Sequence, residues 1–371
     1  MKNVKFLALG ACALLITGGL ASCGKEEMET VKVGFQPNFG ASAGMTAVNE
    51  GYFEEAGVKV EYSNATGPNV AAAVLSGNLD VGFLGNGVAW NYFTENSTMK
   101  LIALDNLTDD DRLIARKGGR GGNLTLQSSE DDLVAALKGS KVGLEIAATP
   151  GSFWNNLLNK LNSNLADGQK IWYMGSDGTK LPAGLAETNY IDTNKVEIFD
   201  VSNANVTAGM NSGAYDFCVA FAPVATTLEK DTAKYVTVAK TSTHMSESYT
   251  PSTWAVNTNF LKNHEAAFKK FMVGLVKGMT KRQNDPAAAA TATEVCTAGA
   301  VSANKIATDI AVWLGAEKQL ELCEKADGKG YAYAENIRNS ALKGGNADKV
   351  KKTVAEAVDF SYVVDAAKKV K

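Results

Sequence analysis

The residues of this sequence best suited to chemistry follow predicted buried strands, where helices are expected to begin. In open α/β sheets, ligands bind beyond the carboxyl ends of the strands, and free N–H groups in the first turns of the helices favour anions. Small and polar residues at such places therefore predict ligand binding, with an anion favoured. The candidates lie in four loops and are Phe39, Gly40 and Ser42; Gly85, Asn86 and Trp90; Thr149, Gly151, Ser152 and Trp154; and Phe221 and Ala222.

Patterns typical of catalysis are missing. The sequence has only two histidines, His244 and His264, and neither lies in the four loops. We find no G-x-S-x-G elbow, no phosphate-binding P-loop and no dinucleotide fingerprint, and no Cys–His spacing suggests a metal site. The sequence therefore predicts a protein that is not an enzyme and that needs neither a cofactor nor a metal.

Two kinds of large side chain near the loops have alternative interpretations. Trp90 and Trp154 could form the walls of a binding cleft, although an aromatic residue on a helix more often belongs to the core. Arg112, Arg116 and Arg120 could pair with an anion. Because these arginines flank a predicted domain boundary, we interpret them as solvated surface charge.

One short pattern occurs twice in the chain. The segments VLSGNLDVGFLGNG (74–87) and MNSGAYDFCVAFAP (210–223) both place Ser-Gly, an Asp and a hydrophobic run in the same order. The pattern predicts a helix that ends at the glycine and a buried strand that begins after Asp80 or Asp216. A carboxylate at this point can accept backbone N–H bonds, so we assign both aspartates a structural role.

Strands that alternate with helices along the chain predict mainly parallel sheets flanked by helices. The alternation restarts after the glycine-rich stretch RKGGRGGN (116–123), which indicates two α/β domains. We predict a discontinuous domain one of residues 31–115 and 241–371, which ends in a helical C-terminal extension, and a domain two of residues 116–240. The two chain crossings between the domains would then act as a hinge.

The N-terminus has the features of an export signal. Residues 1–22 carry a basic start and an apolar run, and Leu20-Ala21-Ser22-Cys23 resembles the lipobox of bacterial lipoproteins. We predict cleavage before Cys23, lipid attachment to that residue and a tether of residues 23–30; a transmembrane anchor is the alternative. The formal net charge of −3 offers no basic surface for nucleic acid. We expect a monomer in the cell envelope, outside the cytoplasm and anchored to a membrane by lipid.

Three cysteines follow the predicted lipid site: Cys218, in a predicted buried strand, Cys296 and Cys323. The last two lie in neighbouring helical segments of a protein expected outside the cytosol, where disulfides persist. We expect either a Cys296–Cys323 disulfide or two separate free thiols.

Several segments together resemble the substrate-binding proteins of bacterial ABC importers for aliphatic sulfonates, taurine and nitrate. They are VNEGYFEEAGVKVEY (48–62), GPNVAAAVLSGNLDVGFLGNG (67–87), LKGSKVGLEIAATPGSFWNNLL (137–158) and NVTAGMNSGAYDFCVAFAP (205–223). The resemblance runs from Val31 to Gln283 and is weakest in the C-terminal helices, 286–371. It implies the type II periplasmic-binding-protein fold, a two-domain clamshell that closes on a small molecule and delivers it to a membrane permease.

The resemblance carries the binding role, loop by loop, to Phe39, Gly40, Ser42, Gly85, Asn86, Thr149, Gly151 and Ser152. It departs at Ala222-Pro223, where many relatives have Glu-Pro, so an amine or a polar ring is less supported as the ligand. We expect a sulfonate, taurine or a similar oxyanion. The alternatives are a heteroaromatic solute such as a thiamine-precursor pyrimidine, with Trp90 and Trp154 as walls, and a surface lipoprotein that serves sensing or adhesion.

Overall fold

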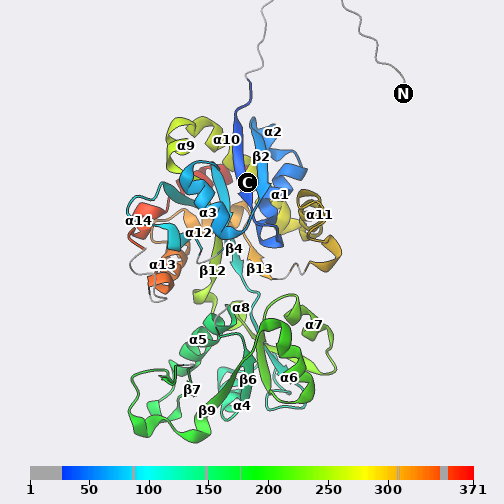
Figure 1. The fold of residues 1–371 in the computed structure, drawn as a ribbon, viewed down its shortest axis with the longest axis vertical. Coiled ribbons are helices and arrows are strands. Elements are labelled where there is room, and N and C mark those ends of the chain that lie inside the picture. Colours follow the sequence, from blue (N-terminus) through cyan, green and yellow to red (C-terminus); the bar gives the residue numbers. More distant parts are fainter. Residues whose placement is uncertain are drawn as a thin grey trace, which may run out of the picture.

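The computed structural model describes residues 27–85, 88–146, 149–175, 177–306, 308, 310–342 and 350–371. Two sheets lie one beyond the other along the long axis of the molecule, each flanked by helices (Figure 1). We call the first sheet with its helices lobe one and the second sheet with its helices lobe two. This mixed α/β architecture, with C-terminal helices, confirms the fold class that the sequence predicts.

The sheet of lobe one has six strands in the order β13-β4-β12-β3-β1-β2. They are β1 (Thr30–Phe35), β2 (Lys59–Asn64), β3 (Val81–Leu84), β4 (Met99–Thr108), β12 (Thr250–Asn257) and β13 (Ala311–Trp313). Strands β1, β2 and β3 are parallel, whereas β12 runs antiparallel to β3 and β4. Because β12 and β13 come from the second half of the chain, lobe one is discontinuous in sequence.

The sheet of lobe two has seven strands in the order β11-β5-β10-β6-β9-β7-β8. They are β5 (Arg112–Arg116), β6 (Lys141–Leu144), β7 (Trp172–Met174), β8 (Lys180–Leu181), β9 (Lys195–Asp200), β10 (Phe217–Ala220) and β11 (Tyr235–Lys240). The centre of the sheet is parallel, and β5 pairs antiparallel with both β10 and β11.

Helices cover both sheets, and most of them belong to lobe one. Lobe one has α1 (Ser42–Asn49), α2 (Tyr52–Ala56), α3 (Gly67–Ser76), α9 (Thr258–Asn263), α10 (Glu265–Asn284), α11 (Pro286–Cys296), α12 (Ala316–Cys323), α13 (Lys329–Ala341), α14 (Val354–Ala357) and α15 (Ser361–Val370). Lobe two has α4 (Glu130–Leu137), α5 (Thr149–Asn162), α6 (Val206–Ser212), α7 (Val224–Lys230) and α8 (Thr241–His244). In the described ranges, no helix combines the length and the apolar character needed to cross a bilayer.

The repeated Asp pattern folds the same way in both lobes. Gly77 and Gly213 end α3 and α6 in left-handed conformations, with φ of 77° and 78°. Asp80 Oδ2 accepts a hydrogen bond from the backbone N–H of Lys32 at 2.8 Å, and Asp216 Oδ2 accepts one from that of Lys141 at 3.1 Å. Each aspartate thus fixes the strand beside its own, which confirms the structural role.

The chain passes between the lobes twice. Residues 109–111 join β4 to β5, and residues 241–249 join β11 to β12. The boundary predicted after residue 115 is therefore wrong by one strand, because β5 lies inside the second sheet. The glycine-rich stretch 116–123 is a turn within lobe two. The chain crosses instead at residues 109–111, which are three aspartates. This segment contains no glycine or proline that would indicate a domain boundary in the sequence.

The two crossings are bonded to each other. Asp109 Oδ1 accepts a hydrogen bond from the backbone N–H of Ser242 at 2.8 Å, and Oδ2 accepts one from the Ser242 hydroxyl at 2.5 Å. Charge-assisted bonds of this kind are stronger than neutral ones. The connection between the lobes is therefore a linked pair of segments.

A buried ion pair holds lobe one together. Arg282, on α10, and Asp105, on β4, are both fully buried, with Nη1 2.7 Å from Oδ2. Arg282 Nη2 also donates to the Asp105 carbonyl at 2.7 Å, and Trp254 Nε1 donates to Asp105 Oδ1 at 2.7 Å. This network ties the returning C-terminal helix to the centre of the sheet.

The predicted Cys296–Cys323 disulfide is not formed. Both cysteines are buried free thiols, as is Cys218. Cys296 Sγ contacts the carbonyl of Met45 at 3.6 Å, whereas Cys323 Sγ contacts Gln319 Oε1 at 3.7 Å. The two thiols end different helices and face different partners, so the alternative of separate thiols holds.

We predict that Arg282→Ala lowers the free energy of unfolding by about 3–5 kcal/mol, because it leaves the Asp105 carboxylate buried without its partner. Urea denaturation measures this loss. Lys281→Ala, which removes only a half-exposed pair with Asp285, is the matched control and should have little effect. Equal losses in the two variants would contradict the central role of the buried pair.

Candidate functional site

The four predicted binding loops lie at the ends of the sheets that face the crossings. Thr253 on β12, the strand that follows the second crossing, pairs with Leu84 at the carboxyl end of β3. Arg112, directly after the first crossing, pairs with Ala220 at the carboxyl end of β10. Since β1 is parallel to β3, and β6 to β10, all four strands point their carboxyl ends toward the crossings. The loops of lobe one are thus opposed to those of lobe two.

The loop after β1 leads through a short helix, η1 (Phe39–Ala41), into α1. Phe39 packs on Trp313, with ring centroids 5.1 Å apart, and belongs to a small apolar cluster. The carbonyl of Gly40 accepts a hydrogen bond from Arg282 Nη1 at 3.1 Å. Ser42 is fully buried, and its hydroxyl has no hydrogen-bond partner in the described part of the chain. Of these three residues, Ser42 keeps a side-chain polar atom available.

Gln36, which the sequence did not single out, lies between two loops of lobe one. A Cβ atom added at Gly67 would lie 2.6 Å from Gln36 Nε2, and one added at Gly85 would lie 3.6 Å from it. Gln36 Nε2 is buried and has no partner among the residues that the structure describes. The one available signal was a polar residue directly after a buried strand. Asn86, predicted beside Gly85, lies outside the described residues.

Both tryptophans of the predicted site are buried. Trp90, in η2 (Ala89–Tyr92), and Trp154, on α5, are each 1% exposed. Their rings pack against Phe93 and Tyr173, with centroids 5.0 and 6.3 Å apart. This burial favours the core interpretation over cleft walls for both rings. Each indole Nε1, however, has no hydrogen-bond partner in the described ranges.

The loop after β6 meets the first crossing. Thr149 begins α5, and its hydroxyl donates to Asp111 Oδ1 at 2.9 Å. Ser152, one turn later, is exposed. A Cβ atom at Gly151 would lie 2.0 Å from the carbonyl oxygen of Ile146, so this position requires glycine.

The loop after β10 also meets that crossing. The backbone N–H and carbonyl of Phe221 are both bonded to the side-chain amide of Asn203, at 3.1 and 3.2 Å. The N–H of Ala222 donates to Asp110 Oδ1 at 3.0 Å. The backbone N–H groups of Phe221 and Ala222 therefore already donate hydrogen bonds within the protein and are not available to a ligand.

The crossing brings a carboxyl group with an unusual pKa to the site. Burial raises the pKa of Asp111 to about 7, and the neighbouring carboxylates of Asp110 and Asp109 add to the increase, whereas the bond from Thr149 and the charge of Arg112 oppose it. Near neutral pH, Asp111 is thus present in both its protonated and its ionised form. Among the described residues, no three His, Cys, Asp or Glu side chains are grouped to hold a metal ion.

The structure contradicts the interpretation of Arg112 as a solvated surface charge. Its side chain is fully buried, with Nε 3.2 Å from Glu229 Oε1 and Nη1 3.9 Å from Asp110 Oδ1. The interpretation is wrong because β5 lies between two other strands, where a cation must be paired.

Four buried polar atoms that can donate a hydrogen bond have no partner in the opposed loops: Gln36 Nε2, Ser42 Oγ, Trp90 Nε1 and Trp154 Nε1; Asn91 Oδ1, in the same short helix as Trp90, is a buried acceptor without a partner in the described ranges. Three are N–H donors and the fourth is a hydroxyl, which can donate. Buried polar groups are nearly always hydrogen-bonded, to protein, water or ligand. Buried polar atoms without partners also occur outside these loops, as at Ser97 and Ser140. The atoms in the opposed loops differ in that they belong to both lobes. Together they favour a ligand that accepts hydrogen bonds.

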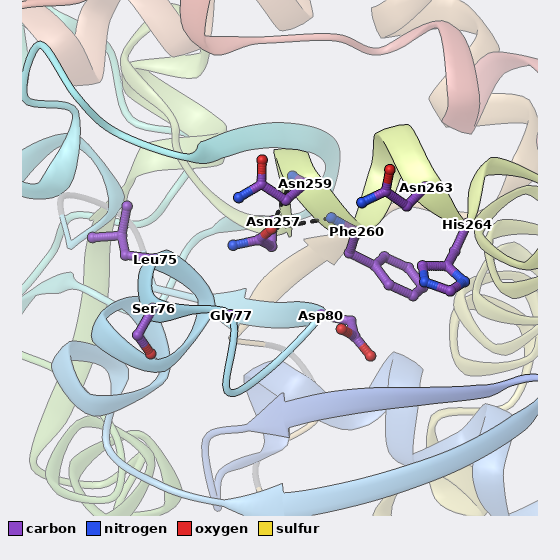
Figure 2. A pocket seen from close by; sticks show the side chains of 9 residues that line it. All are labelled: Leu75, Ser76, Gly77, Asp80, Asn257, Asn259, Phe260, Asn263 and His264. Carbon is purple, nitrogen blue, oxygen red and sulfur yellow. Dashed lines mark hydrogen bonds between the residues drawn. The ribbon is translucent and has the colours of Figure 1, made fainter.

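A cavity of about 240 Å³ lies apart from these loops, at the opposite end of the lobe-one sheet (Figure 2). Asp80, Asn259 and Asn263 line it, and the rings of Phe260 and His264 stack beside them with centroids 5.2 Å apart. Because Asp80 precedes β3, this cavity is remote from the crossings and takes no part in the site.

The two lobes have the two-domain fold of periplasmic binding proteins. A periplasmic sulfonate-binding protein, SsuA, from Methylobacillus flagellatus KT aligns with a TM-score of 0.61 and 16% identity, over 93% of this chain and 96% of that one. The periplasmic aliphatic sulphonate-binding protein SsuA of Escherichia coli aligns with a TM-score of 0.53 and 15% identity, over 89% and 97%. The desulfurization enzyme DszB aligns with a TM-score of 0.52 and 14% identity, over 92% and 100%. At these identities the likeness shows the fold.

The chain belongs to the NMT1-like family, whose model matches residues 24–297. A Brucella abortus (strain 2308) protein, described only as a candidate binding protein, is 28% identical over 173 residues, which are 46% of this chain and 49% of that protein. The chain thus spans about half the length of the curated relatives that it matches.

We predict that Asp111→Asn removes a pH dependence of stability. The folded-state pKa of about 7 lies above the unfolded value of about 3.9, so this carboxyl group destabilises the fold progressively as the pH rises from 4 to 7. The variant should unfold a few degrees higher than the wild type at pH 8 and at a similar temperature near pH 4. Thermal unfolding across this range measures the difference.

The exposed Asp131 on α4 provides the matched control, since Asp131→Asn removes the same charge from the surface. Parallel pH profiles for the wild type and Asp111→Asn would show that Asp111 titrates normally.

Proposed function

We propose that this chain is the extracytoplasmic solute-binding component of an ABC importer. It captures a small molecule between its lobes and delivers it to a membrane permease. The observation that carries this proposal is the set of four buried, unpartnered donor atoms in opposed loops of both lobes. A ligand bonded to both loop sets binds the closed form better than the open form, and so shifts the population toward closure.

The ligand that we propose is a sulfonate, taurine or a similar oxyanion. N–H and hydroxyl donors suit an acceptor with several oxygens, and helix starts favour negative charge. Asp111, beside Thr149, adds a group that repels a simple anion when ionised and attracts an ammonium group. A zwitterion such as taurine, with its sulfonate on the donors and its amine near Asp111, satisfies both. The buried tryptophan rings give a heteroaromatic solute less support.

Binding is proposed in preference to catalysis, although a desulfurization enzyme shares the fold. The cysteines that the structure describes are buried, and burial raises the pKa of Cys323 to about 12, which disfavours the nucleophilic thiolate. The relatives with the sulfonate-binding descriptions are periplasmic proteins. This location is consistent with the export signal that the sequence predicts and with our proposal of a lipid anchor at Cys23, which lies outside the described residues.

We predict that taurine or an alkanesulfonate, at about a hundred times its Kd, raises the free energy of unfolding by about 2.7 kcal/mol, which appears as a higher Tm. Nitrate, thiamine-precursor pyrimidines and amino acids complete the panel. Ser42→Ala and Trp154→Phe should each weaken binding about tenfold, because each removes a buried donor to a charged ligand.

Ser97→Ala is the matched control, since Ser97 Oγ is also buried and unpartnered but lies outside the opposed loops. Equal affinity in Ser42→Ala and Ser97→Ala would contradict the location of the site. A stabilising effect of pyrimidines alone would contradict the oxyanion and leave the binding role.

Lipid attachment gives a separate prediction. The wild-type protein should enter the detergent phase on temperature-induced partition of a nonionic detergent, because acyl chains bury their CH₂ groups in micelles. Cys23→Ala should remain in the aqueous phase. A wild type that partitions like the variant would exclude the anchor.

A further inference from the structure

A second cavity, of about 250 Å³, opens at the end of lobe two that is farthest from the crossings. Strand β5 leaves the first crossing at Arg112 and ends at Arg116, and β11 begins beside it at Tyr235. Arg116, Lys117, Gly118, Asn211, Lys234 and Tyr235 line the cavity. The first three residues of the glycine-rich stretch 116–123, which is no domain boundary, therefore form one wall.

The polar groups of this cavity are almost all donors. Arg116 Nε donates a hydrogen bond to the backbone carbonyl of Tyr215 at 3.3 Å. The two terminal nitrogens of its guanidinium group remain available to a ligand. The Tyr235 hydroxyl donates to Asn211 Oδ1 at 2.6 Å, so the Asn211 amide N–H groups stay available. Lys117 is exposed at the rim.

The carboxylates near the cavity already have partners, and one of them neutralises the lining residue Lys234. None belongs to the lining residues in the described part of the chain. Asp231 pairs with Lys234 at 2.9 Å on the surface. Asp216 bonds the backbone N–H groups of Lys141 and Arg120, at 3.1 and 3.4 Å. The positive charges of Arg116 and Lys117 therefore lack an acidic partner among the described residues.

The glycines make this arrangement possible. A Cβ atom at Gly118 would lie 2.8 Å from Arg116 Nη1, and one at Gly122 would lie 2.1 Å from the Lys117 carbonyl oxygen. Any other residue at these positions would displace the guanidinium group or the turn. The sequence thus builds a turn that holds an arginine and a lysine at the mouth of one cavity.

We infer that this cavity binds a phosphate-type oxyanion, at a site separate from the opposed loops. Arginine offers a planar fork of donors that matches phosphate oxygens, and lysine adds a point charge. The volume is below the roughly 300 Å³ at which pockets for whole drug-sized ligands begin, so it suits an ion or a headgroup. The phosphate can be free or carried by an anionic lipid at a membrane surface.

Calorimetric titration of the full chain carrying Cys23→Ala with inorganic phosphate tests the first source. Sedimentation with phosphatidylcholine vesicles, with and without phosphatidylglycerol, tests the second. For phosphate, for the anionic vesicles or for both, the affinity of Lys117→Gln and of Arg116→Gln should be about tenfold or more below that of the protein without these substitutions. It should stay within about twofold in Lys160→Gln, a matched loss of charge on α5.

Lys117 is exposed, so its variant is expected to fold even if Arg116→Gln does not. Binding to neither probe would overturn the inference, as would an equal loss in Lys117→Gln and Lys160→Gln. Phosphate binding that falls in Ser42→Ala but not in Lys117→Gln would belong to the opposed loops and overturn it too. Failure here leaves the solute-binding proposal standing, because that proposal depends on other residues.

Discussion

The structure depends most on one buried charge pair, Asp105 with Arg282. The two residues are 177 positions apart, and both side chains are fully buried. Their attraction joins the returning helix α10 to strand β4, and the same guanidinium group holds the carbonyl of Gly40. Since Gly40 lies in the short helix directly before Ser42, the C-terminal half of the chain fixes a predicted binding loop of the N-terminal half. A preorganised loop loses less entropy when a ligand binds.

The two lobes use one structural unit and adapt it differently. In both, a glycine ends a helix and an aspartate bonds the neighbouring strand. In lobe two the second oxygen of Asp216 accepts the N–H of Arg120, whereas in lobe one Asp80 borders a cavity. A structural carboxylate can thus close a turn in one copy of the unit and line an open surface in the other.

Local signals predicted much of this architecture. Apolar strands, left-handed glycines and the two aspartates act through neighbouring atoms, and such features can be read from sequence. The crossing at 109–111 could not be predicted, because three aspartates are not a turn signal. Their carboxylates accept hydrogen bonds from Ser242, Thr149 and the N–H of Ala222, which are distant in sequence. The burial of Arg112 depends on Glu229, which is distant in sequence. Gln36 was missed for the same reason, since its importance comes from glycines of other loops.

The bond between Asp109 and Ser242 has a mechanical consequence. Two unlinked connections would let the lobes twist, slide and bend independently, whereas two connections fastened side by side resist twisting and sliding. We expect the remaining motion to be a rotation about a single axis through the fastened segments. A molecule bound between the lobes would then be recognised by the angle at which rotation stops, because a molecule that is too long or too short would stop the rotation at a different angle.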